Sequence, residues 1–305
     1  MSANPHIDPP KGALSQIQAS VLPLTFVVFW STGFIAGKYG LPYAGPMTFL
    51  VIRFAIVAAI LAIAAFIMGA PWPRRDHVLS IAIGGIFVHA GYLGATFAAL
   101  SVGVEAGVAS LMAGLQPLLT AALAGYFLNE QVRLRQWLGL LLGLGGVALV
   151  VNSKLALGLG TPEGMALSFL SALFMTTGTL WQKRFGNSMD LRTGSVIQFT
   201  ASAIVLAPLA FWLEGWRVDW TGHFIGALVW LCLVLSIGTI SLLFILIRRG
   251  ASVEVASLFF LVPPCTALFG ALMFDEQLTG IVLAGMALVA IGVVSFGTTG
   301  LWGWN

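Results

Sequence analysis

Long hydrophobic stretches separated by short polar segments follow one another along almost the whole chain. Apolar residues run continuously within each stretch and do not alternate with polar ones at period two, so the pattern predicts helices and not the strands of a barrel. A helix needs about 20 apolar residues to cross a bilayer core. The pattern predicts ten spans, near residues 18–40, 45–68, 78–101, 104–128, 134–151, 162–183, 193–213, 222–247, 252–274 and 279–298.

Composition leads to the same class. Hydrophobic residues make up 59% of the chain and charged residues 8%, and the mean hydropathy is +0.98, well outside the range of soluble domains. We therefore predict an all-α integral membrane protein with ten transmembrane helices. No P-loop, Rossmann fingerprint, metal-ligand motif or basic cluster interleaved with aromatic residues occurs in the sequence. We expect no cofactor, no nucleic acid, and a monomer whose partners are the bilayer and a small-molecule substrate.

The second half of the chain repeats the first. Six residues recur 147 positions later: Gly103, Val108, Ala109, Ser110, Leu111 and Pro117 return as Gly250, Val255, Ala256, Ser257, Leu258 and Pro264. After a one-residue deletion, Glu130, Gln131, Gly139 and Gly146 return as Glu276, Gln277, Gly285 and Gly292. Nearer the N-terminus, Thr32, Gly33 and Lys38 match Thr177, Gly178 and Lys183, and Arg53 matches Gln198. This internal duplication spans nearly the whole polypeptide.

Each copy holds an odd number of predicted spans, so the two copies should cross the membrane in opposite directions. Such an inverted repeat is typical of alternating-access transporters. We predict a cytoplasmic tail at 1–17, a first five-helix repeat at 18–151, a second, inverted repeat at 162–298, and a second cytoplasmic tail at 299–305.

Basic residues are distributed unequally between alternate loops. Ten lie in one set, namely Lys11, Arg74, Arg75, Arg133, Arg135, Lys183, Arg184, Arg192, Arg248 and Arg249, and three lie in the other, namely Lys38, Lys154 and Arg217. Because cytoplasmic loops carry the excess of Lys and Arg, both termini should face the cytoplasm. We expect a multi-pass protein of a bacterial inner membrane.

Polar residues deep inside predicted spans are candidates for substrate contact. His89 lies near the centre of the third span, and Tyr92 follows three positions later, on the same face of an α-helix. Both could instead be ordinary packed residues. Arg53 is the one basic residue well inside a span, and it could bind a substrate carboxylate, pair with a protein carboxylate or extend toward the interface.

Prolines occupy corresponding positions in the fourth and ninth spans. Gln116 precedes Pro117, and Met112 lies one turn earlier, whereas Pro263 and Pro264 follow Phe259 and Phe260. Proline removes a backbone N–H and interrupts the helical ladder, so paired prolines in two halves indicate a midplane site, although a purely structural kink is the alternative. Two glycines, Gly33 and Gly178, are further hinge candidates. Trp30 lies too deep for an interface anchor.

The acidic residues all fall at predicted helix ends, in loops or in the N-terminal tail. Because proton-coupled pumps usually carry a titratable carboxylate within the membrane, and only His89 could replace it here, facilitated transport is the favoured mechanism. The same absence disfavours a cationic substrate.

The Ala-Ser-Leu, proline and Glu-Gln pattern at 109–131, with its echo at 256–277, resembles that of the EamA-type transporters of the drug/metabolite transporter superfamily. The resemblance covers residues from about 20 to 298 and implies ten helices in two inverted halves. The set of His89, Tyr92, Trp30 and Met112 looks most like that of bacterial aromatic amino acid exporters in this family. Export of aromatic or large neutral amino acids by alternating access is the function that the resemblance implies.

Other functions remain open at this stage. A carrier of sugar phosphates would need several inward basic residues, and only Arg53 qualifies. Drug transport and proton-coupled transport are further alternatives. An intramembrane enzyme would need a nucleophile and base, or a metal set, and no motif links the candidate residues. A non-transporting scaffold would leave the inverted repeat unexplained.

Overall fold

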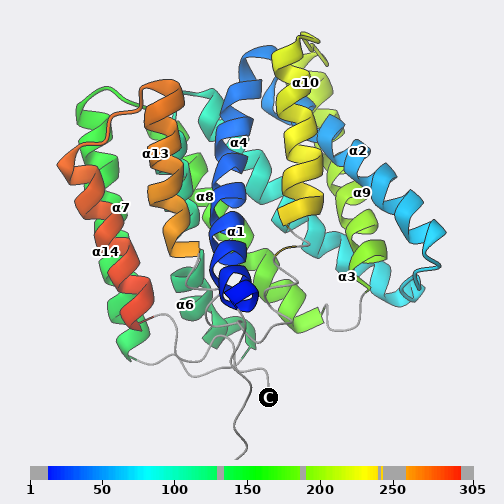
Figure 1. Cartoon of the computed structure of the whole chain (residues 1–305), viewed down its shortest axis with the longest axis horizontal. Helices are drawn as coiled ribbons and strands as arrows, with labels where there is room; N and C mark the ends of the chain where they lie inside the picture. The colour runs from blue at the N-terminus through cyan, green and yellow to red at the C-terminus, as the bar shows by residue number, and fades with distance from the viewer. Residues whose placement is uncertain (1–12, 129–133, 186–189, 240–241, 243–258, 297–305) are drawn as a thin grey trace, which may run out of the picture.

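The computed structural model describes residues 13–128, 134–185, 190–239, 242 and 259–296, and these are almost entirely helical (Figure 1). The first half contains α1 (Ala13–Gly40), η1 (Leu41–Tyr43), α2 (Pro46–Ile67), α3 (Arg75–Gly85), η2 (Ile86–Leu93), α4 (Gly94–Ser101), α5 (Ala106–Ala113), α6 (Gln116–Leu128) and α7 (Leu134–Ala156). The second half contains α8 (Pro162–Phe185), α9 (Leu191–Leu209), η3 (Ala210–Glu214), α10 (Gly222–Val229), η4 (Trp230–Thr239), η5 (Phe259–Leu261), α13 (Val262–Phe274) and α14 (Gly280–Phe296). The predicted tail at 299–305 and most of that at 1–17 lie outside the described residues.

Seven helices of the described chain are long and apolar enough to cross a membrane. Three shorter apolar helices, at Ala106–Thr120, Val262–Phe274 and Gly280–Gly292, coincide with the other predicted spans. The start of the predicted ninth span, at 252–258, lies outside the described residues. A multi-pass, helical membrane protein is therefore confirmed.

The fourth predicted span is not one continuous helix. It is divided at Gly114 and Leu115 into α5 and α6, and Pro117 is the second residue of α6. Pro263 and Pro264 likewise lie in the first turn of α13. The prolines therefore stand at helix starts, where the missing N–H costs nothing because the first N–H groups of a helix have no intrahelical partner.

Two wide π-helical segments interrupt the third and eighth spans. η2 runs from Ile86 to Leu93 and η4 from Trp230 to Thr239, at corresponding places in the two halves. The α-helical spacing predicted for His89 and Tyr92 is wrong, since both residues lie in η2, where the turn is wider. π-Helical turns are rare and occur often at functional sites.

Helices of the two halves pack in antiparallel pairs. At one edge of the molecule α7 lies beside α14, and at the opposite edge α2 lies beside α9 (Figure 1). A Cβ at Gly146 would lie 2.6 Å from the Gly285 carbonyl oxygen, and one at Gly292 would lie 2.7 Å from that of Gly139. Residue numbers rise along α7 as they fall along α14. The glycines permit this close approach because they carry no side chain.

Candidate functional site

Arg53 is the buried basic residue of α2. The helix begins at Pro46, and the Glu214 carboxylate receives hydrogen bonds there from the N–H groups of Met47 and Thr48, at 2.8 and 2.7 Å. About two turns further along, the Arg53 side chain lies in the protein interior, with the residue 7% exposed. Its guanidinium donates to Ser236 Oγ in η4 at 3.1 Å. Within the described part of the chain, Arg53 Nε has no hydrogen-bond partner.

His89 lies next to this arginine. Its ring stacks on Phe199 of α9, with centroids 4.2 Å apart and planes at 25°, and meets Phe54 edge-on at 5.9 Å. The imidazole lies near the Gln198 side chain and the Arg53 guanidinium. Tyr92 is 8% exposed, and its hydroxyl also interacts electrostatically with Arg53. The structure thus brings together three predicted site residues from α2 and η2.

Gln198 and Ser236 complete this polar cluster, and sequence reasoning did not select them. Gln198 is 5% exposed, and its Nε2 has no partner among the described residues. A Cβ at Gly85 would lie 2.5 Å from the Gln198 backbone, so the missing side chain at Gly85 lets α3 and α9 approach there. The sequence contained a signal for Gln198, because this residue is the repeat counterpart of Arg53. Arg53 and Gln198, which are equivalent positions of the duplicated sequence, thus belong to the same polar cluster.

A second group of predicted residues is aromatic. Trp30 of α1 meets Phe259 of η5 edge-on, with centroids 4.9 Å apart, and Phe26 contacts both rings at 5.4 and 5.3 Å. Met112, 3% exposed, belongs to the same hydrophobic cluster. The sequence missed Phe26, although it lies one turn from Trp30. The side chain of the predicted Phe260 lies outside the described residues.

Gln116 and the hinge glycines lie elsewhere. Gln116 Nε2 donates to Thr120 Oγ1 at 3.1 Å and to Thr179 Oγ1 of α8 at 3.4 Å. Among the described residues, its hydrogen bonds do not join it to the His89 cluster. A Cβ at Gly33 would lie 3.2 Å from Leu235 of η4, and one at Gly178 would lie 2.6 Å from Val88 of η2. Each predicted hinge glycine therefore packs against a π-helical segment of the other half.

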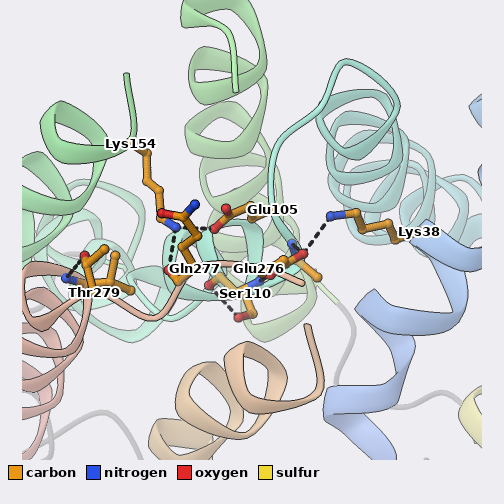
Figure 2. Close-up of polar contacts among 10 residues, drawn as sticks. Lys38, Glu105, Ser110, Lys154, Glu276, Gln277 and Thr279 are labelled. Carbon is orange, nitrogen blue, oxygen red and sulfur yellow. Dashed lines mark hydrogen bonds and ion pairs between the residues drawn. The ribbon is translucent and has the colours of Figure 1, made fainter. Parts of the chain in front are cut away.

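A charged network joins four elements at another place in the fold (Figure 2). Lys38, in the last turn of α1, forms a 2.7 Å ion pair with Glu276, which lies between α13 and α14. The Glu276 carboxylate also accepts hydrogen bonds from the N–H groups of Ala106 and Gly107 at 2.7 and 3.2 Å. It therefore caps the N-terminus of α5, where a negative charge is favourable.

Lys154 extends this network from the last turn of α7. Its ammonium lies 2.5 Å from Glu105 and donates to the Gln277 carbonyl oxygen at 2.7 Å; the whole residue is buried. The interpretation of Lys38 and Lys154 as loop charges is wrong, because both cations lie within helices and have carboxylate partners from distant segments.

Comparison with known proteins agrees with this architecture. The profile of the EamA-like transporter family matches twice, at residues 18–152 and 162–298. A Bacillus subtilis protein described as "Uncharacterized transporter YvbV" is 27% identical over 290 residues, covering 92% of each chain. Proteins described as "Probable amino-acid metabolite efflux pump" are 25% identical, one from Salmonella typhimurium (89% of this chain, 92% of the relative) and one from Escherichia coli (90% and 92%).

A solved structure, described only as "Crystal structure of protein", has the same fold. Its TM-score is 0.60 at 22% identity, covering 92% of this chain and 97% of that one. At this identity the likeness concerns the fold alone. The double match of the family profile, together with the apolar helices, establishes that the chain belongs to the EamA-like transporter family.

Proposed function

We propose that this transporter exports neutral amino acids, aromatic or large apolar ones above all, with related small metabolites, across a bacterial inner membrane by alternating access. The cluster of buried Arg53 and Tyr92 with half-buried His89 carries this proposal, because polar groups at membrane depth are costly and mark substrate pathways. The names of the Salmonella typhimurium and Escherichia coli relatives support the substrate class.

The aromatic group supports a substrate with an apolar side chain. Trp30, Phe26 and Phe259 meet one another at angles of 44° to 85°, which leaves ring edges and faces at different orientations. An aromatic ligand gains about 0.5–1.5 kcal/mol from each favourable ring contact beyond the burial of its area. Such contacts tolerate several side chains, so we expect broad selectivity among large neutral amino acids.

Alternating access is supported by the way the halves pack. α7 against α14 and α2 against α9 are pairs of repeat counterparts in antiparallel contact, as two inverted repeats would make. The fourth span is interrupted at Gly114, and Pro117 and its repeat counterpart Pro264 lie in the first turns of α6 and α13. Interrupted helices of this kind line the sites of many secondary transporters. We propose that the two halves rock about the interruption at Gly114 and about the starts of α6 and α13.

Two alternatives are less well supported. A phosphorylated substrate carries two negative charges and needs several free cations, whereas the buried basic residues of the described chain are Arg53 and Lys154, and Lys154 is already paired with Glu105. Obligatory proton coupling would call for a carboxylate inside a span. Glu276, the buried carboxylate of the described chain, and half-buried Glu105 bind Lys38 and Lys154 at helix ends, which favours facilitated transport.

Transport by purified protein in liposomes tests the proposal. Labelled phenylalanine, tryptophan, leucine and threonine should enter vesicles preloaded with unlabelled phenylalanine, and protein-free vesicles give the background.

Tyr92→Ala and Trp30→Ala should reduce phenylalanine and tryptophan exchange more than threonine exchange. Removing a polar contact costs about 1–3 kcal/mol, so His89→Ala and Gln116→Ala should weaken transport about tenfold or more. Vesicles that move a sugar phosphate but no neutral amino acid would refute the proposal.

A further inference from the structure

Two buried hydrogen-bond donors in the polar cluster lack acceptors. They are Arg53 Nε and Gln198 Nε2, and neither has a partner within the described residues. The residues are 7% and 5% exposed. Burying a donor without an acceptor is unfavourable, and burying an unpaired charge is more so. The cluster therefore has an excess of donors over acceptors.

Among the described residues, the groups around these donors supply no negative charge. Arg53 donates to the Ser236 hydroxyl and lies near the His89 imidazole and the Tyr92 phenol. Ion pairs between described residues join Lys38 to Glu276, Arg74 to Asp76, Lys154 to Glu105 and Arg192 to Asp190, and Arg53 takes part in none of these. Its guanidinium retains an edge that could bind an anion.

His89 lies beside the second donor. Its ring stacks on Phe199, the residue that follows Gln198, with centroids 4.2 Å apart. Gln198 Nε2 has no partner among the described residues. The amide nitrogen is therefore available to a ligand.

We infer that Arg53 and Gln198 together bind the carboxylate of the transported molecule. A guanidinium matches a carboxylate in shape and charge, and such charge-assisted hydrogen bonds are about twice as strong as neutral ones. One cation suits a monoanionic group. The inference rests on the proposed function and narrows it: the transporter recognises the carboxylate of amino acids, so amino acid amides and amines that lack a carboxylate are poor ligands.

The test compares ligands that differ only in this group. Binding of phenylalanine and of phenylalaninamide to purified protein is measured by ligand-induced thermal stabilisation, in wild type, Arg53→Gln, Gln198→Leu and the exposed control Arg217→Gln. Wild type and the control should prefer phenylalanine by about ten- to a hundredfold. Arg53→Gln should lower this ratio to near one, and Gln198→Leu should lower it to an intermediate value.

The outcomes separate the two proposals. If wild type binds phenylalanine and the preference persists unchanged in both Arg53→Gln and Gln198→Leu, the carboxylate assignment is wrong although amino acid transport stands. If wild type neither binds nor transports any neutral amino acid, the proposed function itself fails. Should Arg53→Gln not be recovered as folded protein, Arg53→Lys, which keeps the charge but loses the planar fork, must reduce the ratio for the inference to stand.

Discussion

Lys38 and Glu276 are separated by 238 positions in the sequence and form an ion pair of 2.7 Å. The same carboxylate caps α5 through Ala106 and Gly107. One buried side chain therefore connects the end of α1, the start of α5 and the segment between α13 and α14. Figure 2 shows Lys38 pointing toward Glu276 from the neighbouring helix.

Glu276→Ala should destabilise the protein more than Lys38→Met. The first change removes the partner of Lys38 and leaves two N–H groups of α5 without an acceptor. The Lys38 side chain is 23% exposed, so its replacement should lower the free energy of unfolding less. Removing one partner of a buried pair costs about 3–5 kcal/mol. Thermal unfolding in detergent measures the effect. Asp76→Ala is the control, since its pair with Arg74 is exposed and should contribute little.

Gly146→Ala should disturb the packing of α7 on α14, whereas Gly145→Ala should not. A Cβ at Gly146 would lie 2.6 Å from the Gly285 carbonyl oxygen, but one at Gly145 would meet nothing within 4 Å. Overpacking typically costs about 1–3 kcal/mol, and alanine at an open helical position is neutral or stabilising. Equal melting temperatures for the two variants would show that α7 and α14 can move apart without loss of stability.

Pro117→Ala should change the transport rate more than substrate binding. Alanine restores an N–H at the start of α6 and allows α5 and α6 to join into one straighter helix. Initial rates and the Kd for phenylalanine are compared in the same preparation. Pro162→Ala is the control, because Pro162 begins α8 at an exposed position. An unaltered rate in folded Pro117→Ala protein would indicate that the proline is purely structural.

Single cysteines placed in a background without Cys232 and Cys265 should report the orientation. A cysteine at residue 74 should react with an impermeant reagent from the cytoplasmic side, and cysteines at residues 157 and 217 from the outside. The reason is the ten-to-three distribution of basic residues between alternate loops. Labelling of residues 74 and 217 from the same side would contradict the predicted topology.

Uptake of phenylalanine should continue when the pH is equal on both sides of the vesicle membrane. We expect this because no carboxylate of the described chain lies unpaired in the interior of a span, where it could carry a proton. The measurement compares exchange with and without an imposed gradient and an uncoupler. Loss of uptake whenever the gradient is abolished, with His89→Ala removing only that dependence, would establish coupling instead.

The amino-acid sequence by itself determined the class of the protein and its duplicated organisation. Continuous apolar stretches predict membrane helices because the bilayer core offers backbone groups no other partners. The repeat was visible because equivalent residues kept their spacing, and the double match of the family profile confirms two copies. Arg53 lies well inside an apolar segment, but its burial, as against extension toward the interface, is known only from the structure.

Only the tertiary structure decided which of these residues meet. His89 and Tyr92 lie near Arg53 because of a π-helical turn. Such a turn leaves no mark in hydrophobic periodicity because its hydrogen-bond register depends on packing. Gln198 joined them from the other half of the chain. Lys38 and Lys154 looked like loop charges, yet their carboxylate partners come from α5 and from the segment before α14. A charge pattern along one chain cannot specify partners that only helix packing brings within hydrogen-bond distance.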